Sequence, residues 1–310
     1  MTNRSSESGV RPWASLRPGD TVRLVSPASF PEDPGAIEEL TGILLGWGLR
    51  VQVGEHALDR HGYMAGTDED RLADLNAAYA DPVVRALITT RGGAGAYRIL
   101  DGIDYAAIRA DPKPLIGFSD ITYLHLAIWQ HVHVPGIHGC LVGADAIDTV
   151  RHLLTTTRPH VLARNPELMS AAVETPGRAR GFTMGGSLAA LAGMVGAGLP
   201  DLSGAIVIIE AQRVVGLGQV DRQLTQLIRS GAFDGIAAIA LGRFHGFEDY
   251  TDRGWNLIDV LRDRLIPLGK PILGGLEIGH GPDPHAIALG VAAELDTDSG
   301  TLTCYSPEGR

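Results

Sequence analysis

Short apolar segments alternate with helical patterns through the first half of the chain, and this alternation restricts the fold more than any other feature. TVRLVSPAS at residues 21–29 predicts a strand that ends in a turn, and PGAIEELTGILLGWG after it predicts a helix with one apolar face. LRVQVGEHA, VRALITTRGG and PLIGFSD predict further strands, each followed by a helical segment. Repeated units of this kind form a parallel sheet with helices on both faces, and ligand sites gather beyond the carboxyl ends of its strands. We therefore predict an open, mostly parallel α/β domain over residues 1–155.

The second half follows a less regular pattern. TTTRPH and ETPGRAR interrupt the periodicity, so we assign residues 156–178 to a linker. TMGGSLAALAG predicts a glycine-rich turn into a helix, LSGAIVIIE a strand that ends on Glu210, and VDRQLTQLIRSGAF an amphipathic helix. AIALGVAAELDTDSGTLTCY predicts a hairpin turned at Asp298-Ser299-Gly300. These elements favour a separate α+β domain over residues 179–310, which we expect to be a swivelling, barrel-like unit.

Charge and cysteine content exclude several classes of protein. The formal net charge of −10 is unsuited to nucleic acid or an anionic membrane, since phosphate binding requires a basic face. No apolar run approaches the ~18 residues of a membrane span, and the polar N-terminus lacks the apolar core of a secretory signal. The two cysteines, Cys140 and Cys304, show no metal-ligand spacing and suit a reducing compartment. We expect a cytoplasmic protein with no nucleic-acid or membrane partner.

Ser119 follows the apolar run LIGF, where a predicted strand turns into the helical segment ITYLHLAIWQHV. A nucleophilic serine needs this position, because free N–H groups at a helix start, including that of Asp120, can stabilise a developing oxyanion. GFSDI lacks the second glycine of the G-x-S-x-G elbow, however, and serine is also a preferred helix cap. The motif alone leaves both interpretations open, a nucleophile and a cap.

The loop RGGAGAYR, which begins at Arg91, is a second candidate site. Its spacing matches neither G-x-G-x-x-G nor the phosphate loop G-x-x-x-x-G-K-[ST], so we expect no nucleotide cofactor. The backbone N–H groups of Gly92 and Gly93 could hold an anion or a carbonyl oxygen beside a helix start. A plain turn between strand and helix is the alternative.

Glu210 ends an otherwise unbroken apolar strand, and His280 lies between two glycines in EIGHGPDPH. A solvated strand end and a surface histidine are the ordinary interpretations of such residues, and His285 is a rival for the histidine role. Together with Ser119, these residues supply the three roles of a catalytic triad, namely attack, proton transfer and orientation of the imidazole. Because triads are assembled in space, the large sequence separations are no obstacle.

The segment HLAIWQHVHVPGIHG contains four histidines, so a metal site has to be considered. His131 and His133 would diverge by roughly 200° on a helix, and no H-E-x-x-H motif occurs. We expect no metal ion. His138, which precedes a glycine at the predicted mouth of the sheet, is a candidate pocket residue.

In order along the chain, RGGAGAYRIL, LIGFSDITYLHLAI, GIHG, GGSLAAL, IVIIE followed by VDRQLTQL, and GLEIGHG resemble the blocks of the LD-carboxypeptidase family. That family comprises serine peptidases, among them muramoyltetrapeptide carboxypeptidases and microcin C self-immunity peptidases. The matching blocks run from about residue 21 to about residue 295.

The resemblance implies an N-terminal α/β domain that carries the serine, a C-terminal domain that carries the glutamate and histidine, and a cleft between them. Position by position, it makes Ser119 the nucleophile, Glu210 the orienting carboxylate and His280 the general base. It also implies a homodimer that works without a metal or other cofactor. The backbone N–H groups of the oxyanion hole would come from Gly92, Gly93 and Asp120.

Three departures from the family pattern bear on specificity. Ala211, Gln212 and Arg213 follow the glutamate where acidic residues are often found. Ser187 stands where an asparagine is common, and Ala94 where an aromatic residue is common. The candidate substrate contacts are Arg91, Arg98, His138 and Ser187, and either arginine could bind a terminal carboxylate or make a structural salt bridge.

The sequence thus predicts a serine carboxypeptidase that trims the terminal D-alanine from a murein tetrapeptide through an acyl-enzyme. A self-immunity or antibiotic-processing peptidase that cleaves a peptidyl or aminoacyl nucleotide conjugate is the first alternative, because the residues after Glu210 are altered. A catalytically silent module that binds peptide fragments in the same cleft is the second.

Overall fold

A six-stranded sheet forms the centre of the N-terminal part of the computed structural model, which describes residues 9–33 and 35–306. Its strand order is β11-β5-β4-β3-β1-β2; five strands run parallel, and β11 pairs antiparallel with β5. Apolar side chains of its inner strands are buried on both faces, as expected for a sheet that helices cover on both sides. The strands are β1 (Thr21–Val25), β2 (Arg50–Val53), β3 (Val84–Thr89), β4 (Leu115–Gly117), β5 (Gly136–His138) and β11 (Ile287–Leu289).

Helices pack against both faces of this sheet. On one face, α1 (Gly35–Gly46) and α5 (Ala144–Thr155) bury Leu44 and Leu154 against β1 and β4. On the other, α2 (Asp68–Ala80), α3 (Tyr105–Ala110) and α4 (Thr122–Val132) share an apolar core with Leu87 of β3, beside the 3-10 helix η1 (Ala96–Gly102). A capping box of Thr67 and Asp70 begins α2. The predicted α/β class is confirmed.

A seven-stranded sheet forms the centre of the C-terminal part, in the order β10-β9-β8-β7-β12-β13-β6. The first four are parallel and the last three antiparallel. Over the described residues the sheet is open, with β10 and β6 at its edges, so the expected barrel-like form is wrong. The strands are β6 (His160–Ala163), β7 (Arg178–Ser187), β8 (Ala205–Gln212), β9 (Ala238–His245), β10 (Ile272–Leu273), β12 (Ala292–Asp296) and β13 (Thr301–Cys304).

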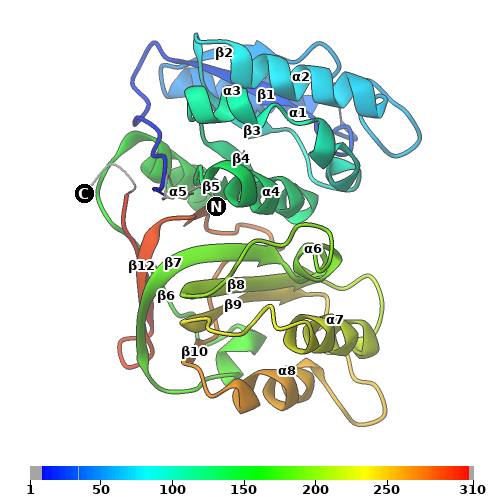
Figure 1. Cartoon of the computed structure of the whole chain (residues 1–310), viewed down its shortest axis with the longest axis vertical. Helices are drawn as coiled ribbons and strands as arrows, with labels where there is room; N and C mark the ends of the chain where they lie inside the picture. Colours follow the sequence, from blue (N-terminus) through cyan, green and yellow to red (C-terminus); the bar gives the residue numbers. More distant parts are fainter. Residues whose placement is uncertain (1–8, 34, 307–310) are drawn as a thin grey trace, which may run out of the picture.

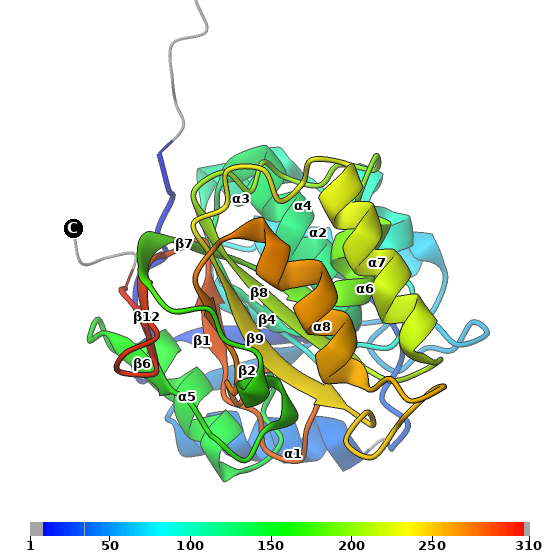
Figure 2. The same cartoon turned by 90° about the horizontal axis from the view of Figure 1, so that it is seen from below.

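Three helices lie together along one side of this sheet, as Figure 2 shows. They are α6 (Leu188–Gly193), α7 (Leu217–Arg229) and α8 (Leu257–Leu265), accompanied by the short 3-10 helices η3 (Met169–Ala172) and η4 (Ile266–Leu268). The predicted hairpin is confirmed, since β12 and β13 pair antiparallel across the turn at residues 297–300. None of the described helices is long and apolar enough to cross a membrane.

In Figure 1, β4 and β5 lie on the side of the first sheet that is nearer to the C-terminal part. The chain passes between the two parts more than once, because β11 comes from the second half but completes the first sheet. Strand β6 and η3 lie within the segment assigned to the linker, and β6 is an edge of the seven-stranded sheet. The division at residues 155 and 179 stays a prediction.

Candidate active site

Ser119 stands at a strained turn between β4 and α4. The strand ends at Gly117, Phe118 remains extended, and Ser119 then adopts a positive φ of 63° at the start of the 3-10 helix η2 (Ser119–Ile121). A serine rarely takes this conformation, which costs of order 1 to 3 kcal/mol and is typical of functional sites. Its hydroxyl caps neither η2 nor α4 and instead lies 3.1 Å from Nε2 of His280. The helix-cap interpretation is therefore wrong.

The glycine loop after β3 lies directly against this serine. A Cβ added to Gly92 would lie 2.9 Å from the Cβ of Ser119 and 3.0 Å from the carbonyl oxygen of Phe118, so only glycine fits there. Two side chains fix the loop: Ser29 Oγ accepts the Ala94 N–H at 3.1 Å, and the Asp120 carboxylate accepts the Ala96 N–H at 2.8 Å. The loop backbone is thus held close to the serine oxygen.

Asp120 is the only ionisable residue of η2, and it is largely buried beside the serine. Burial raises the pKa of its carboxyl group to about 6, although the Ala96 N–H and the charge of Arg71 act in the opposite direction. An acidic residue at this position therefore carries an electrostatic cost at neutral pH.

Glu210 lies near the carboxyl end of β8 and is fully buried. The pairing of β8 with β9 shifts register between Ile209 and Ala211, and a bulge at this point can turn a side chain out of the regular pleat. Burial opposes ionisation of the carboxyl group. Its hydrogen bonds with His280 and the charge of that ring, with a smaller contribution from His138, nevertheless hold the pKa of Glu210 below its usual value.

His280 lies between the glutamate and the serine. Its ring Nδ1 is 2.7 Å from Oε2 of Glu210, and its backbone N–H donates to the same oxygen at 3.1 Å. Gly279, with φ of 95°, permits this approach, because a Cβ there would lie 2.4 Å from the carboxylate oxygen. An ionised carboxylate only accepts hydrogen bonds, so Nδ1 donates and Nε2 is free to accept the proton of the Ser119 hydroxyl.

A cleft of about 490 Å³ opens in front of the serine, between the two parts of the molecule. Val142 and Val214 line it from opposite parts, and both side chains are more than half exposed. Its lining also includes Thr89, Arg91, Gly92, Gly93, Phe118, Asp120, Tyr123, Cys140, Ser187, Ala190 and Gln212.

The four predicted substrate contacts fall into three different environments. Arg91 and Ser187 line the cleft, and Arg91 forms an ion pair of 2.8 Å with Glu32, whose side chain is 77% exposed. Arg98 lies in another cavity beside Tyr97 and Tyr105, where it pairs with Asp68. 

His138 is fully buried behind Glu210 and lines no part of the cleft. For Arg98 and His138, a direct substrate contact is therefore not supported by their positions.

Sequence reasoning missed Tyr123 and Val214 as cleft residues, and it missed that the side chain of Asp120 anchors the glycine loop. Gln212, one of the residues expected to bear on specificity, does line the cleft. Strand alternation gave one usable signal, because residues two apart on a strand share a face and Gln212 is two after Glu210. The contact of Tyr123 depends on where α4 docks, which no local pattern reveals.

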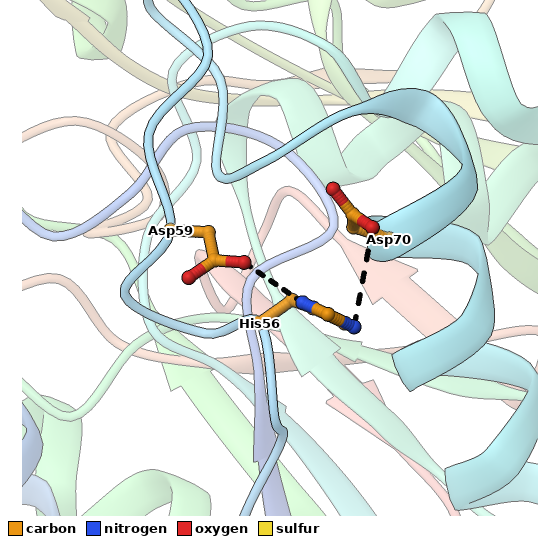
Figure 3. Close-up of side chains that lie close together, drawn as sticks. All are labelled: His56, Asp59 and Asp70. Atoms are coloured by element: carbon orange, nitrogen blue, oxygen red, sulfur yellow. Dashed lines mark hydrogen bonds and ion pairs between the residues drawn. The ribbon is translucent and has the colours of Figure 1, made fainter.

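One group of described side chains lies close enough together to hold a metal ion, namely His56, Asp59 and Asp70 (Figure 3). His56 Nδ1 is 2.8 Å from Asp59, and its Nε2 is 4.0 Å from Asp70. Asp70 already accepts the N–H and hydroxyl of Thr67 in the cap of α2. None of the three lines the cleft, and the histidines of residues 125–138 do not form such a group within the described ranges.

A serine hydroxyl becomes a useful nucleophile when a base accepts its proton and a carboxylate orients that base. Residues from η2, β8 and the loop after β10 meet in this arrangement, which is typical of a serine hydrolase. The LD-carboxypeptidase N-terminal domain matches residues 22–139, and the LD-carboxypeptidase C-terminal domain matches residues 180–295. The chain belongs to the LD-carboxypeptidase family, and it is a serine-type enzyme of that family.

Two curated relatives match almost the whole chain. A Streptomyces coelicolor protein named "Putative carboxypeptidase" is 39% identical over 96% of this chain and 97% of its own length. A Bacillus subtilis protein named "Probable murein peptide carboxypeptidase" is 36% identical over 93% of this chain and 92% of its own length.

Solved structures of two related proteins have the same fold. The muramoyltetrapeptide carboxypeptidase from Oxalobacter formigenes superposes with a TM-score of 0.80 at 25% identity, covering 91% of this chain and 97% of that one. An MccF-like protein from Bacillus anthracis superposes with a TM-score of 0.86 at 22% identity, covering 96% of this chain and 100% of that one. At that lower identity the second likeness concerns the fold alone.

Proposed function

We propose that this protein is a carboxypeptidase that hydrolyses the L,D-peptide bond to the terminal D-amino acid of a murein tetrapeptide, leaving the tripeptide. The observation that carries the proposal is the continuous chain of contacts from Ser119 through His280 to Glu210, at 3.1 and 2.7 Å. The names of the murein peptide carboxypeptidase relative and of the muramoyltetrapeptide carboxypeptidase structure support the choice of substrate.

In the first half of the reaction, Ser119 Oγ attacks the carbonyl carbon of the scissile bond while its proton passes to Nε2 of His280. The imidazolium that forms is stabilised by the buried carboxylate of Glu210. Backbone N–H groups of the glycine loop, from Gly92 or Gly93, and of Asp120 receive the negative charge on the carbonyl oxygen. His280 then protonates the leaving nitrogen, the C–N bond breaks, and the D-amino acid departs with its free amine.

In the second half, a water molecule attacks the acyl-enzyme and gives its proton to His280. The ester bond to Ser119 breaks, the serine oxygen regains its proton, and the tripeptide leaves with a new carboxylate. Every proton is carried by side chains of this chain, so the proposed mechanism calls for no metal or other cofactor.

Recognition of the terminal carboxylate is assigned to Arg91, the only arginine among the described residues that line the cleft. Its present partner, Glu32, is mostly exposed, so a substrate carboxylate can compete for the guanidinium at little cost. Ser187, at the end of β7, offers a hydroxyl on the opposite side of the cleft. We also retain the expectation of a cytoplasmic homodimer, which light scattering and cell fractionation would test.

The defining experiment is mass-spectrometric detection of D-alanine release from a murein tetrapeptide. Ser119→Ala and His280→Ala should each lower the rate by about 10⁴-fold or more, because triad members act as a unit. His285→Ala is the matched control, since that histidine pairs with Asp145 and does not line the cleft. A Ser119→Ala variant that still works at near wild-type rate would show the mechanism to be wrong.

A self-immunity or antibiotic-processing peptidase is the second candidate. The uncharged residues Ala211 and Gln212 after the glutamate favour it. Competition between a murein tetrapeptide and an aminoacyl-sulfamoyl nucleotide separates the two substrates. A silent peptide-binding module is the third candidate, and it predicts that a fluorophosphonate fails to label Ser119.

A further inference from the structure

The imidazole of His138 packs against the side of Glu210 that His280 does not reach. His138 ends β5, is fully buried, and pairs in register with Gly117 of β4. The ring of Phe118 meets it edge-on at 6.0 Å between centroids. On another side the backbone of Gly186 approaches so closely that an added Cβ would lie 2.9 Å from the ring. These contacts fix the direction in which the ring points.

The two oxygens of Glu210 are treated unequally. Oε2 accepts both the ring N–H and the backbone N–H of His280. Oε1 accepts no hydrogen bond from any described residue, and it lies 3.9 Å from Nε2 of His138, whose own nitrogens have no other partner. A buried carboxylate oxygen left without a donor is costly, and so is a buried imidazole N–H left without an acceptor.

Chemistry decides which nitrogen of His138 carries the proton. Glu210 is held in its ionised form and can only accept, so a lone pair on the facing nitrogen would repel it. Burial lowers the pKa of His138 to about 4, so the ring is neutral and has one proton to place. That proton belongs on Nε2, where it points at the unpartnered oxygen.

We propose that His138 is a positioning residue of the triad, an uncharged donor whose Nε2–H is directed at Oε1 of Glu210 and fixes the carboxylate for His280. The proposal rests on the function proposed above, because it acts through the glutamate of the triad. At 3.9 Å the pair is longer than a hydrogen bond, and a movement of about 1 Å closes it. Catalytic contacts are commonly long in free enzymes and shorten when substrate binds.

A neutral donor suits this position better than a cation. Arginine or lysine would cancel the negative charge that Glu210 must present to the imidazolium of His280 during acylation. An imidazole N–H orients the carboxylate and stabilises it moderately while leaving its net charge intact.

Removing the donor has a predictable effect on pH dependence. The titratable groups that face His138 are Glu210 of β8, His280 of the following loop and, from α4, His125. Without the donor, the buried glutamate is less stable as a lone anion, so the glutamate–histidine pair takes up a proton more readily. The acidic limb of the activity profile therefore moves to higher pH.

The experiment compares His138→Leu, which fills the space without a donor, with His138→Gln, whose amide N–H reaches the same position. His160→Leu is the control, since that histidine also has a buried ring nitrogen without a partner but lies in β6, outside the cleft. The rate of Ser119 labelling by a fluorophosphonate and kcat and KM for the tetrapeptide are followed from pH 5 to 9. We expect His138→Leu to lose 10- to 100-fold in kcat and labelling rate near neutral pH, with KM little changed.

We also expect the acidic limb of His138→Leu to rise by about one pH unit, with His138→Gln and His160→Leu close to wild type. A pH profile of activity for His138→Leu that matches the wild type overturns the proposal. An equal loss of kcat and labelling rate in His138→Leu and His138→Gln, with the acidic limb unmoved, overturns it as well. Nitrogen-15 NMR of the wild-type histidines tests it without any variant: an Nε2–H tautomer is expected for His138, and an Nδ1–H tautomer refutes the proposal.

The two proposals fail in different ways. Wild-type protein that labels at Ser119 but leaves the tetrapeptide intact refutes the proposed substrate and leaves the His138 comparison readable through labelling. If the wild-type protein labels at Ser119 and cleaves the tetrapeptide, and the His138 variants behave like it, only the role of His138 is refuted.

Discussion

Asp120→Asn should stabilise this protein at neutral pH and leave it unchanged in acid. The carboxyl group lies beside Ser119 and accepts the Ala96 N–H at 2.8 Å, a bond that the amide oxygen of asparagine can also accept. The substitution therefore removes the buried charge while keeping the anchor of the glycine loop.

The magnitude follows from the shift in pKa. Burial raises the pKa of Asp120 from 3.8 to about 6, so the folded protein binds this proton more tightly than the unfolded chain does. Stability that comes from the bound proton is fully present below about pH 4 and is lost as pH rises through about 6. At neutral pH the ionised group thus costs about 3 kcal/mol, of which more than 1 kcal/mol appears between pH 5 and pH 7.5.

The assay is urea unfolding of wild-type and Asp120→Asn protein at pH 5 and at pH 7.5. Subtracting one protein from the other at each pH removes the contribution of every other titrating group. The free energy of unfolding of the variant minus that of the wild type should increase by about 1 kcal/mol or more from pH 5 to pH 7.5. A difference in stability that stays constant with pH, or one that grows towards acid, would refute the assignment of a raised pKa to this carboxyl group.

Two further predictions concern the cleft. Gly92→Ala should lower kcat about 100-fold, because the new Cβ would lie 2.9 Å from that of Ser119 and displace either the serine or the loop. Gly42→Ala, in helix α1, should leave the kinetics unchanged, because a Cβ there would meet no atom within 4 Å. Arg91→Ala should raise KM for the tetrapeptide about tenfold or more with kcat little affected, whereas Arg98→Ala should change neither, because Arg98 lies in a different cavity. Steady-state kinetics decide both, and equal effects of the two arginine variants would contradict the assignment of the carboxylate site.

The local pattern of the sequence was sufficient to predict four of the six strands of the N-terminal sheet, β1 to β4, and the helices between them. Alternation of short apolar runs with amphipathic segments depends only on neighbours in the chain, and it located β1, β3 and β4 and the helices between them. The strand ends that carry Ser119 and Glu210 follow from the same pattern, because each residue closes an apolar run. That the two strand ends meet does not follow from it, since β4 and β8 belong to different sheets.

Pairings between distant segments were not predictable in this way. IALGVAAELD reads as one continuous arm of a hairpin, yet Gly290, with φ of 77°, divides it. Ile287–Leu289 joins the first sheet as β11, and Ala292–Asp296 joins the second as β12. The open edges of the second sheet likewise depend on which strands meet, and the expected barrel-like form was wrong for that reason.

By itself, the sequence determined the chemistry available to this protein: a serine after an apolar strand, a glycine loop, a strand-end glutamate and a histidine between glycines. It left open whether Ser119 was a cap or a nucleophile, since both use the same residue at the same kind of turn. Only the tertiary structure excludes the cap, because the serine hydroxyl caps neither η2 nor α4. The positive φ of the serine and the 3.1 Å between its oxygen and Nε2 of His280 support the proposed nucleophile. The tertiary structure also places His138 behind Glu210, whereas the sequence suggested that it lines the cleft. The physical reason is that hydrogen bonds and burial depend on distances between residues that are remote in sequence, and only the packing of the two sheets sets those distances.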